Sequence, residues 1–463
     1  MLWDRRTRRA GRLRGALALA TGALLAALLV LAALPALAQE QAPKVEHSRL
    51  PNGLDIYVYE DHTAPLVSVN LWYRVGSRDE PVGLRGMAHL MEHMMFKGST
   101  RVGPEQHARL IQAAGGISNA FTTTDATVYW EKVPSSQLEL ALALEAERMA
   151  HLAITPEKLA SEREVVKEEY RAKLQNDPIG VAFDRFHSFM FEGTPYAWTP
   201  AGFLDDLDRI TVNDLDRFYR THYVPSNAVL VVAGDTTLAE VERLALLHFG
   251  PIPPGEAPER QAIRFAAPAL GQPRREQLAL PVQVPGVLAG FAVPGARSED
   301  RYALAVASSI LSGGESARLY QRLVKERQLA VYAGGAPLDY AHAGAFLGIS
   351  FFLPPHTPEQ EVEALLAEIG RLADEPPTPE ELAAARNQVA AAMAFQMDSL
   401  DGVAELIGGA VVVEGDLGAF TRGIEPYLQV SAQDVQRVAR RYLQPAHATV
   451  VTLVPAEGGA ARP

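Results

Sequence analysis

The chain of 463 residues contains no cysteine. Disulfide bonds and lipid attachment through a cysteine are therefore excluded, and the composition is compatible with an oxidising compartment without requiring one. Low-complexity tracts and heptad runs are also lacking. With 48% apolar and 21% charged residues, the chain is long enough and apolar enough to form two ordinary globular domains.

An excess of positive charge is lacking outside the N-terminal segment. Residues 1–38 hold six arginines and one aspartate, so without them the 43 basic and 55 acidic residues fall to 37 and 54, a net charge of −17. This balance disfavours nucleic acid or an anionic membrane surface as a partner. A basic peptide is easier to attract, but charge alone does not select a substrate.

The first 38 residues differ from the rest of the chain. Arginines precede an apolar run of alanine and leucine from Ala16 to Leu34, and Ala-Leu-Ala at 36–38 then precedes Gln39. This order is typical of a secretory signal peptide. We expect export to the periplasm, cleavage after Ala38 and no stable membrane span in the mature chain. The alternative is an uncleaved membrane anchor, because the apolar run is long for a signal.

The most informative motif is His89-Leu90-Met91-Glu92-His93, which has the form H-x-x-E-H. On a helix, His89 and His93 leave the same face, and Glu92 stays near it. Two neutral imidazoles can hold a zinc ion while the carboxylate takes a proton from water. The alternative is a solvated or salt-bridged surface. The apolar flanks from Met87 to Phe96 favour a buried helix, in which such histidines need a partner such as a metal.

A catalytic zinc site needs a third protein ligand, and a second predicted helix offers candidates. Its start is indicated by Thr155 as the cap, Pro156 at the first helical position and Glu157 in the first turn. Glu162 and Glu169 lie seven residues apart on this helix and share a face.

A charged surface helix is the alternative interpretation. We prefer it for Glu164, Lys167 and Glu168, because Glu168 points about 100° away from Glu169. From spacing alone, Glu169 is only a weak candidate.

The two motifs together resemble the pitrilysin/insulinase metallopeptidases, a family that includes the mitochondrial processing peptidase. The shared pattern is H-x-x-E-H followed, 76 residues after the second histidine, by a glutamate in an E-R-x-x-V-x-x-E helix. The resemblance covers residues 46–454. Further matching segments are Asn52-Gly53-Leu54, Gly76-Ser77-Arg78-Asp79-Glu80, Phe96-Lys97-Gly98, Gly115-Gly116 before Asn119-Ala120-Phe121-Thr122, Pro195-Tyr196 and Tyr223-Val224-Pro225-Ser226-Asn227-Ala228.

The resemblance implies the roles of the site residues. His89, His93 and Glu169 would bind one Zn²⁺ per chain, Glu92 would be the general base, and Glu162 would orient the ligands.

The resemblance also implies a peptide-binding strand. Substrate would lie along Asn119, Ala120 and Phe121. This segment is polar and β-prone and follows two glycines, so as a sheet edge it could pair with an extended peptide. The alternative is a plain loop and strand.

An internal repeat indicates the architecture. At an offset of 223, Thr155–Ala160 recurs as Thr378–Ala383, and Arg163 and Val166 recur as Arg386 and Val389. At an offset of 220, the residues that recur are Asp214, Arg217, Pro225 and Ala228, as Asp434, Arg437, Pro445 and Ala448. We therefore expect an α+β fold of two homologous domains. Each is a mainly antiparallel sheet with helices on one face, like that of the mitochondrial processing peptidase. The expected boundaries are a signal peptide at 1–38, a zinc-bearing domain at 44–250, a linker at 251–270 and a metal-free domain at 271–457.

The second copy lacks the chemistry of the first. Glu162 and Glu169 correspond to Ala385 and Ala392, and no histidine occurs at Leu304–Gly313, where the metal helix should recur.

Active members of the family carry an arginine and a tyrosine seven residues apart in this half, which hold substrate and stabilise the developing oxyanion. Here the positions are Val324 and Val331, and valine cannot donate a hydrogen bond. Arg322, Arg327 and Tyr332 are close in sequence but point to other faces.

These features together predict an exported zinc metalloendopeptidase that hydrolyses peptides or small unfolded proteins. We expect the chain to be the zinc-bearing subunit of a heterodimer, rather than a homodimer, whose homologous metal-free partner supplies the arginine and tyrosine. The alternative is a non-catalytic peptide-binding or assembly subunit. The presence of Glu92 disfavours it, because structural zinc needs no base.

Overall fold

The computed structural model describes residues 44–260, 262, 263, 265 and 271–456. The predicted signal peptide at 1–38 and part of the predicted linker at 251–270 lie outside these residues. Residues 251–260, the first part of that linker, contain no helix or strand. Within the described ranges, no helix is long and apolar enough to cross a membrane.

The first sheet has six strands joined by five pairings, of which four are antiparallel and one, β2 with β6, is parallel. Strand β4 is the last strand and pairs with β5. In spatial order the strands are β1 (Val45–Arg49), β2 (Asp55–Glu60), β6 (Ala228–Gly234), β3 (Leu66–Tyr73), β5 (Thr127–Pro134) and β4 (Ile117–Thr122).

The second sheet repeats this plan with five strands, again with one parallel pair, β7 with β11. Its last strand, β9, pairs with β10. In spatial order the strands are β7 (Arg274–Leu280), β11 (Thr449–Pro455), β8 (Gly286–Pro294), β10 (Ala343–Phe352) and β9 (Ala330–Asp339).

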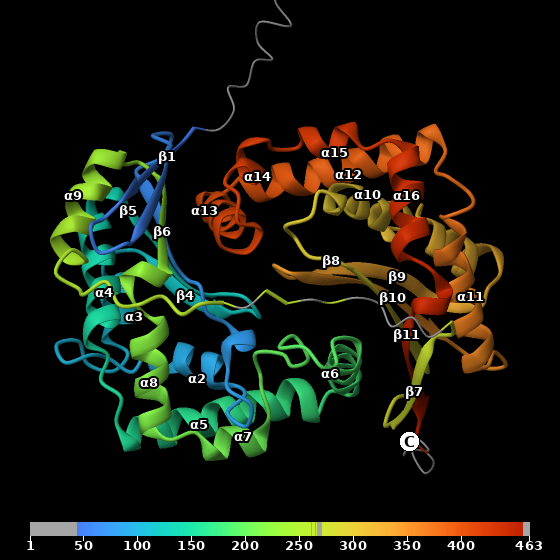
Figure 1. The fold of residues 1–463 in the computed structure, drawn as a ribbon, viewed down its shortest axis with the longest axis horizontal. Helices are drawn as coiled ribbons and strands as arrows, with labels where there is room; N and C mark the ends of the chain where they lie inside the picture. Colours follow the sequence, from blue (N-terminus) through green and yellow to red (C-terminus); the bar gives the residue numbers. More distant parts are fainter. Residues whose placement is uncertain (1–43, 261, 264, 266–270, 457–463) are drawn as a thin grey trace, which may run out of the picture. The chain divides into compact units, whose positions relative to one another are not determined.

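Helices follow the strands of each sheet, and Figure 1 shows both sets coloured along the sequence. Those of the first half are α2 (Met87–Met94), α3 (Gln106–Ala113), α4 (Leu138–His151), α5 (Pro156–Tyr170), α6 (Pro178–Met190), α7 (Leu204–Arg209), α8 (Val212–His222) and α9 (Leu238–His248). Those of the second half are α10 (Asp300–Ser312), α11 (Pro358–Arg371), α12 (Pro379–Met397), α13 (Leu400–Gly409), α14 (Gly418–Thr421), α15 (Glu425–Gln429) and α16 (Ala432–Tyr442).

Each sheet buries both faces, because β-strands direct successive side chains to opposite sides. In β3, Leu71 packs with the helices of its own half, whereas Trp72 packs with Val403 and Ile407 of α13. In the second sheet, Phe186 of α6 packs in the same way against the face away from α10 and α11. Residues from each half therefore cover the second face of the other half's sheet.

The repeat seen in the sequence is also a repeat of helix caps. Thr211 and Asp214 form a capping box at the start of α8, and Ser431 and Asp434 form the same box at the start of α16. Thr155 caps α5 and Thr378 caps α12, each by accepting a hydrogen bond from the backbone three residues on.

The predicted α+β fold of two homologous domains is confirmed. The predicted domain boundaries stay a prediction.

Candidate metal centre

Helix α2 presents the H-x-x-E-H motif from a buried position. Met87, Ala88, Leu90, Met91 and Met94 are all buried, as the apolar flanks predicted. They fix the helix against the first sheet, so the remaining face, with both histidines and Glu92, is turned toward the site.

A glycine allows the chain to enter this helix. Gly86 has φ +95°, and a Cβ there would lie 2.9 Å from Cδ2 of Leu207. The left-handed backbone favours glycine here.

Helix α5 supplies the glutamates. Leu159 and Val166 are buried in the core of the first domain, which fixes the rotation of the helix. Glu162 is then buried, with 3% of its side chain exposed, and Glu169 retains 29%. Glu168 is 71% exposed and pairs with Arg171, so the predicted surface role of that residue agrees with the structure.

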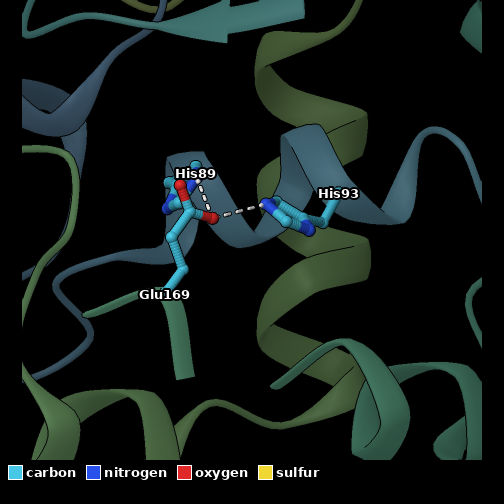
Figure 2. Close-up of side chains that lie close together, drawn as sticks. All are labelled: His89, His93 and Glu169. Carbon is cyan, nitrogen blue, oxygen red and sulfur yellow. Dashed lines mark ion pairs between the residues drawn. The ribbon is translucent and has the colours of Figure 1, made fainter. Parts of the chain in front are cut away.

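Three donor atoms converge between the two helices. Nε2 of His89 lies 3.7 Å and Nε2 of His93 lies 3.5 Å from Oε2 of Glu169. Figure 2 shows the carboxylate facing both imidazoles. The donor atoms of the three residues all lie within 4.8 Å of one another.

This arrangement fits a zinc ion. Two atoms each about 2.1 Å from one ion, at a tetrahedral angle, lie roughly 3.4 Å apart, close to the observed separations. The separations also exceed ordinary hydrogen-bond lengths. Two imidazole nitrogens and one carboxylate oxygen are the ligand types that zinc accepts in sites with an open position.

The charges around the three residues suit metal binding. Burial, with the neighbouring His93, lowers the pKa of His89 to about 4, so this ring is neutral at pH 7 and its nitrogen can be a ligand. Burial acts to raise the pKa of Glu169, but the hydrogen bond from Lys173 and the charge of Lys173 outweigh it, and the pKa is lowered. Lys173 binds Oε1 of Glu169, while Oε2 faces the histidines.

Glu92 lies beside this cluster. Its Oε2 accepts a 2.5 Å hydrogen bond from the hydroxyl of Thr122. Burial raises the pKa of Glu92, although the Thr122 hydrogen bond acts to lower it. A cavity of 410 Å³ joins His89, Glu92 and Glu169 to β4 and to Tyr170.

Glu162 lies behind His93 rather than in the cavity. Its Oε2 is 3.6 Å from Nδ1 of His93, and its Oε1 is 3.1 Å from Nζ of Lys97. A carboxylate in this position can orient an imidazole, and the role of Glu162 stays a prediction.

The predicted peptide-binding residues lie on an edge strand. Ala120 and Phe121 line the cavity. Phe121 also meets Trp72 edge to face, with ring centroids 6.1 Å apart. Asn119 is exposed, and its Oδ1 accepts a hydrogen bond from the N–H of Ala120. The structure therefore brings two of the three to the metal cluster.

Two contacts were missed by sequence reasoning. The role of Thr122 could have been inferred from strand alternation, which puts Thr122 on the same face as Ala120. The role of Glu80 could not have been inferred from a sequence pattern. Its carboxylate accepts hydrogen bonds from the backbone of Gly86 and Ala88, at the start of α2.

A second cluster of potential ligands lies in the first domain. His107, Glu131 and Glu145 are all buried and close together. Arg148 already lies among them, with Nε 2.8 Å from Glu145 and Nη2 3.2 Å from Glu131. Because the guanidinium supplies the positive charge, this is an ion-pair cluster.

The second half contains no counterpart of the metal cluster among its described residues. Ala385 is buried on α12 at the position of Glu162. Val324 packs against the core of its domain, and Val331 is 50% exposed on β9. Arg322 is engaged elsewhere, with Nε 3.1 Å from Glu368.

The fold and the convergent nitrogen and oxygen donors define a metallopeptidase-type domain pair, and comparison with known proteins agrees. The sequence model described as "Insulinase (Peptidase family M16)" matches residues 56–200, and "Peptidase M16 inactive domain" matches residues 209–389. The chain belongs to the insulinase family, peptidase family M16.

Individual relatives span nearly the whole chain. Zinc protease PqqE of Helicobacter pylori is 31% identical over 433 residues, covering 90% of this chain and 94% of the relative. Mitochondrial-processing peptidase subunit beta of Blastocladiella emersonii is 26% identical over 435 residues, covering 90% of each. The crystal structure of a protease from Helicobacter pylori has a TM-score of 0.82 and 30% identity, covering 89% of this chain and 100% of that one.

Proposed function

We propose that this protein is an exported zinc metalloendopeptidase that hydrolyses peptides or small unfolded proteins. The observation that carries the proposal is the convergence of Nε2 of His89, Nε2 of His93 and Oε2 of Glu169 within 4.8 Å, with Glu92 beside them. A relative named a zinc protease supports the same metal.

His89, His93 and Glu169 are the proposed ligands of one zinc ion per chain. When bound, zinc would polarise the scissile carbonyl and lower the pKa of water. Glu162 would keep His93 in position, and Lys97 holds Glu162 in turn, with Nζ 3.1 Å from Oε1.

Glu92 is the proposed general base. Its carboxylate takes a proton from the attacking water and returns it to the leaving amine. Burial raises the pKa of Glu92, which brings it closer to neutral pH and makes it a better base.

Strand β4 is the proposed peptide-binding surface. It pairs on one side with β5 and is the last strand of the sheet, so its other side can pair with an extended substrate. Asn119, Ala120 and Phe121 would then lie along the substrate. Backbone pairing selects for extended conformation rather than sequence.

We also propose that the chain is the zinc-bearing subunit of a heterodimer, with a homologous metal-free partner. Valine at 324 and 331 cannot provide the donors that an oxyanion requires. Arg322 pairs with Glu368 and Glu375, so it does not replace them. One relative is itself named as a subunit. The arginine-rich and apolar segment at 1–38 supports export to the periplasm.

The test uses residues 39–463, wild type and Glu92→Gln, with Glu168→Gln as the matched control on an exposed glutamate. Zinc content is measured by elemental analysis, and cleavage of a pool of unstructured peptides is followed by mass spectrometry. We expect one zinc per chain in all three proteins, with slow cleavage that Glu92→Gln alone abolishes.

Other outcomes have distinct meanings. Cleavage that survives Glu92→Gln contradicts the proposed base. Strong Glu92-dependent cleavage by the isolated chain contradicts the heterodimer but supports the peptidase. Zinc and peptide binding without any cleavage, even with the partner subunit added, would favour a non-catalytic subunit.

A further inference from the structure

The hydroxyl of Thr122 joins the edge strand β4 to the metal-motif helix α2. It donates a hydrogen bond of 2.5 Å to Oε2 of Glu92. This length is characteristic of a charge-assisted bond between a hydroxyl and a carboxylate. The contact fixes one of the two carboxylate oxygens of Glu92, Oε2.

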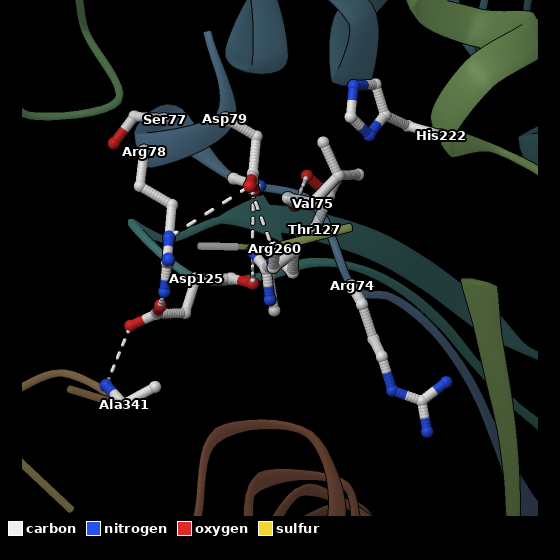
Figure 3. Close-up of polar contacts among 12 residues, drawn as sticks. Arg74, Val75, Ser77, Arg78, Asp79, Asp125, Thr127, His222, Arg260 and Ala341 are labelled. Carbon is white, nitrogen blue, oxygen red and sulfur yellow. Dashed lines mark hydrogen bonds and ion pairs between the residues drawn. The ribbon is translucent and has the colours of Figure 1, made fainter. Parts of the chain in front are cut away.

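The strand is anchored directly after Thr122. The backbone N–H groups of Ser77 and Arg78 donate hydrogen bonds to the carbonyl oxygens of Thr123 and Thr124, both at 3.2 Å. Nη1 of Arg78 lies 3.1 Å from Oδ1 of Asp125 in the same turn, and Figure 3 shows this contact. Several hydrogen bonds therefore hold the end of β4 in place.

The helix is anchored by the same short segment of chain. Glu80, two residues after Arg78, accepts hydrogen bonds from the N–H groups of Gly86 and Ala88 at 2.9 and 2.8 Å. One segment thus fixes both Thr122 and the helix of Glu92. Because both elements are fixed in this way, the Thr122 hydroxyl can hold the Glu92 carboxylate in one orientation.

We infer that Thr122 is a positioning residue, whose hydroxyl holds the Glu92 carboxylate in the orientation that proton transfer needs. The inference rests on the proposed function, because it refines the role of Glu92. Thr122 also ends the strand proposed to bind peptide, so a peptide on β4 lies next to the group that orients the base.

The test compares two variants of zinc-loaded residues 39–463. Thr122→Val keeps the shape but removes the hydroxyl, and Thr122→Ser keeps the hydroxyl. The probe is a peptide hydroxamate, whose hydroxamic acid binds zinc and hydrogen-bonds to an adjacent carboxylate. Its affinity is measured by isothermal titration calorimetry, with and without Glu92→Gln, and zinc content is measured in every protein.

We expect Thr122→Val to weaken hydroxamate binding about tenfold, because a hydrogen bond to a charged group is lost. Thr122→Ser should stay within about threefold of wild type. In the Glu92→Gln background, Thr122→Val should add no further loss, because its effect acts through Glu92.

Equal weakening with and without Glu92→Gln overturns the inference, as does no weakening at all. Loss of zinc from Thr122→Val also overturns it, since Thr122 would then support the fold or the metal. Absence of peptide cleavage even with the partner subunit added, with hydroxamate binding still coupled to Glu92, would contradict the proposed function and leave the role of Thr122 supported. A native chain that binds no hydroxamate contradicts both.

Discussion

Oε1 of Glu80 accepts a 2.8 Å hydrogen bond from the backbone N–H of Ala88, one residue before His89. Oε2 binds the N–H of Gly86 and Nε1 of Trp198, both at 2.9 Å. The first N–H groups of a helix have no partner within it, so a carboxylate here completes the start of α2 and suits its positive end. Burial raises the pKa of Glu80, whereas the three N–H donors act to lower it and favour the carboxylate.

This contact predicts that Glu80→Gln weakens zinc binding although Glu80 lies outside the metal cluster. The amide NH₂ of glutamine would face N–H donors, which loosens the start of α2 and the position of His89. Loss of groups that orient ligands typically lowers metal affinity about 10–100-fold. Zinc affinity is measured by competition with a chromophoric chelator. Glu164→Gln, on a side chain that is 62% exposed, should leave it unchanged. Equal affinities for the two variants contradict the prediction.

The glutamates of α5 should differ in their effect on zinc. Glu169→Gln removes a proposed ligand and should lower zinc affinity by more than about a hundredfold, whereas Glu162→Gln should lower it about 10–100-fold. Glu168→Gln, on the same helix but exposed, should have no effect. The same chelator competition gives the order. The assignment of Glu169 is wrong if Glu169→Gln binds zinc as tightly as Glu168→Gln.

The contacts of Asp125, in the turn after β4, should contribute strongly to the free energy of unfolding. Oδ1 of Asp125 accepts hydrogen bonds from Arg78 at 3.1 Å and from Tyr196 at 2.9 Å, and Oδ2 accepts one from the N–H of Ala341 at 2.8 Å. Its backbone oxygen accepts another from Arg260 at 2.8 Å. Figure 3 shows Asp125 between Arg78 and Ala341. The Asp125 side chain is only 3% exposed.

Asp125→Asn should therefore lower the free energy of unfolding by about 3–5 kcal/mol, the usual effect of removing one partner of a buried ion pair. The matched control is Asp216→Asn, because Asp216 pairs with Arg220 at the surface, where the two side chains are 43% and 75% exposed. That change should lower the free energy by at most about 1 kcal/mol. Urea denaturation followed by circular dichroism gives both values. Similar losses in the two variants would show that the Asp125 network contributes little.

Local patterns were enough to pair His89 with His93 and to place the helices that carry the candidate ligands. The spacing of His89 and His93 defines one face of a helix, and Thr155 with Pro156 defines where α5 begins, because both effects act within a few residues. The internal sequence repeat predicted two similar domains, because residues that recur in the sequence form the same helix caps and strands in each domain. The link from α5 to α2 came from the family resemblance, because spacing alone cannot select Glu169.

Long-range contacts could not be predicted in this way. Asp125 and Ala341, which are joined by a hydrogen bond, are 216 residues apart. Such pairs depend on how the elements pack, which leaves no periodic signal in the sequence. The packing of α13 against the first sheet could not be predicted for the same reason. Its apolar residues predict that it is buried, but not against which sheet.

Two histidines should give the protein opposite responses to pH. His187 on α6 is buried with Nε2 2.7 Å from the hydroxyl of Tyr340, and burial lowers its pKa to about 4. His62 is exposed, and its hydrogen bond to Asp235 raises its pKa. The folded state thus resists protonation of His187 and favours protonation of His62.

For His187, the unfolded state takes up a proton near pH 6.5 while the folded state stays neutral to about pH 4. Stability from this group is therefore present above pH 6.5 and is lost as the pH falls toward 4. We expect the difference in unfolding free energy between wild type and His187→Gln to narrow by about 2–3 kcal/mol between pH 7 and 4.5. His62→Gln is the control of opposite sign, because stability from His62 is present at low pH and is lost as the pH rises through its raised pKa. Urea denaturation of the three proteins across this range checks both directions, and a pH-independent difference for His187→Gln would contradict the neutral, buried state of that ring.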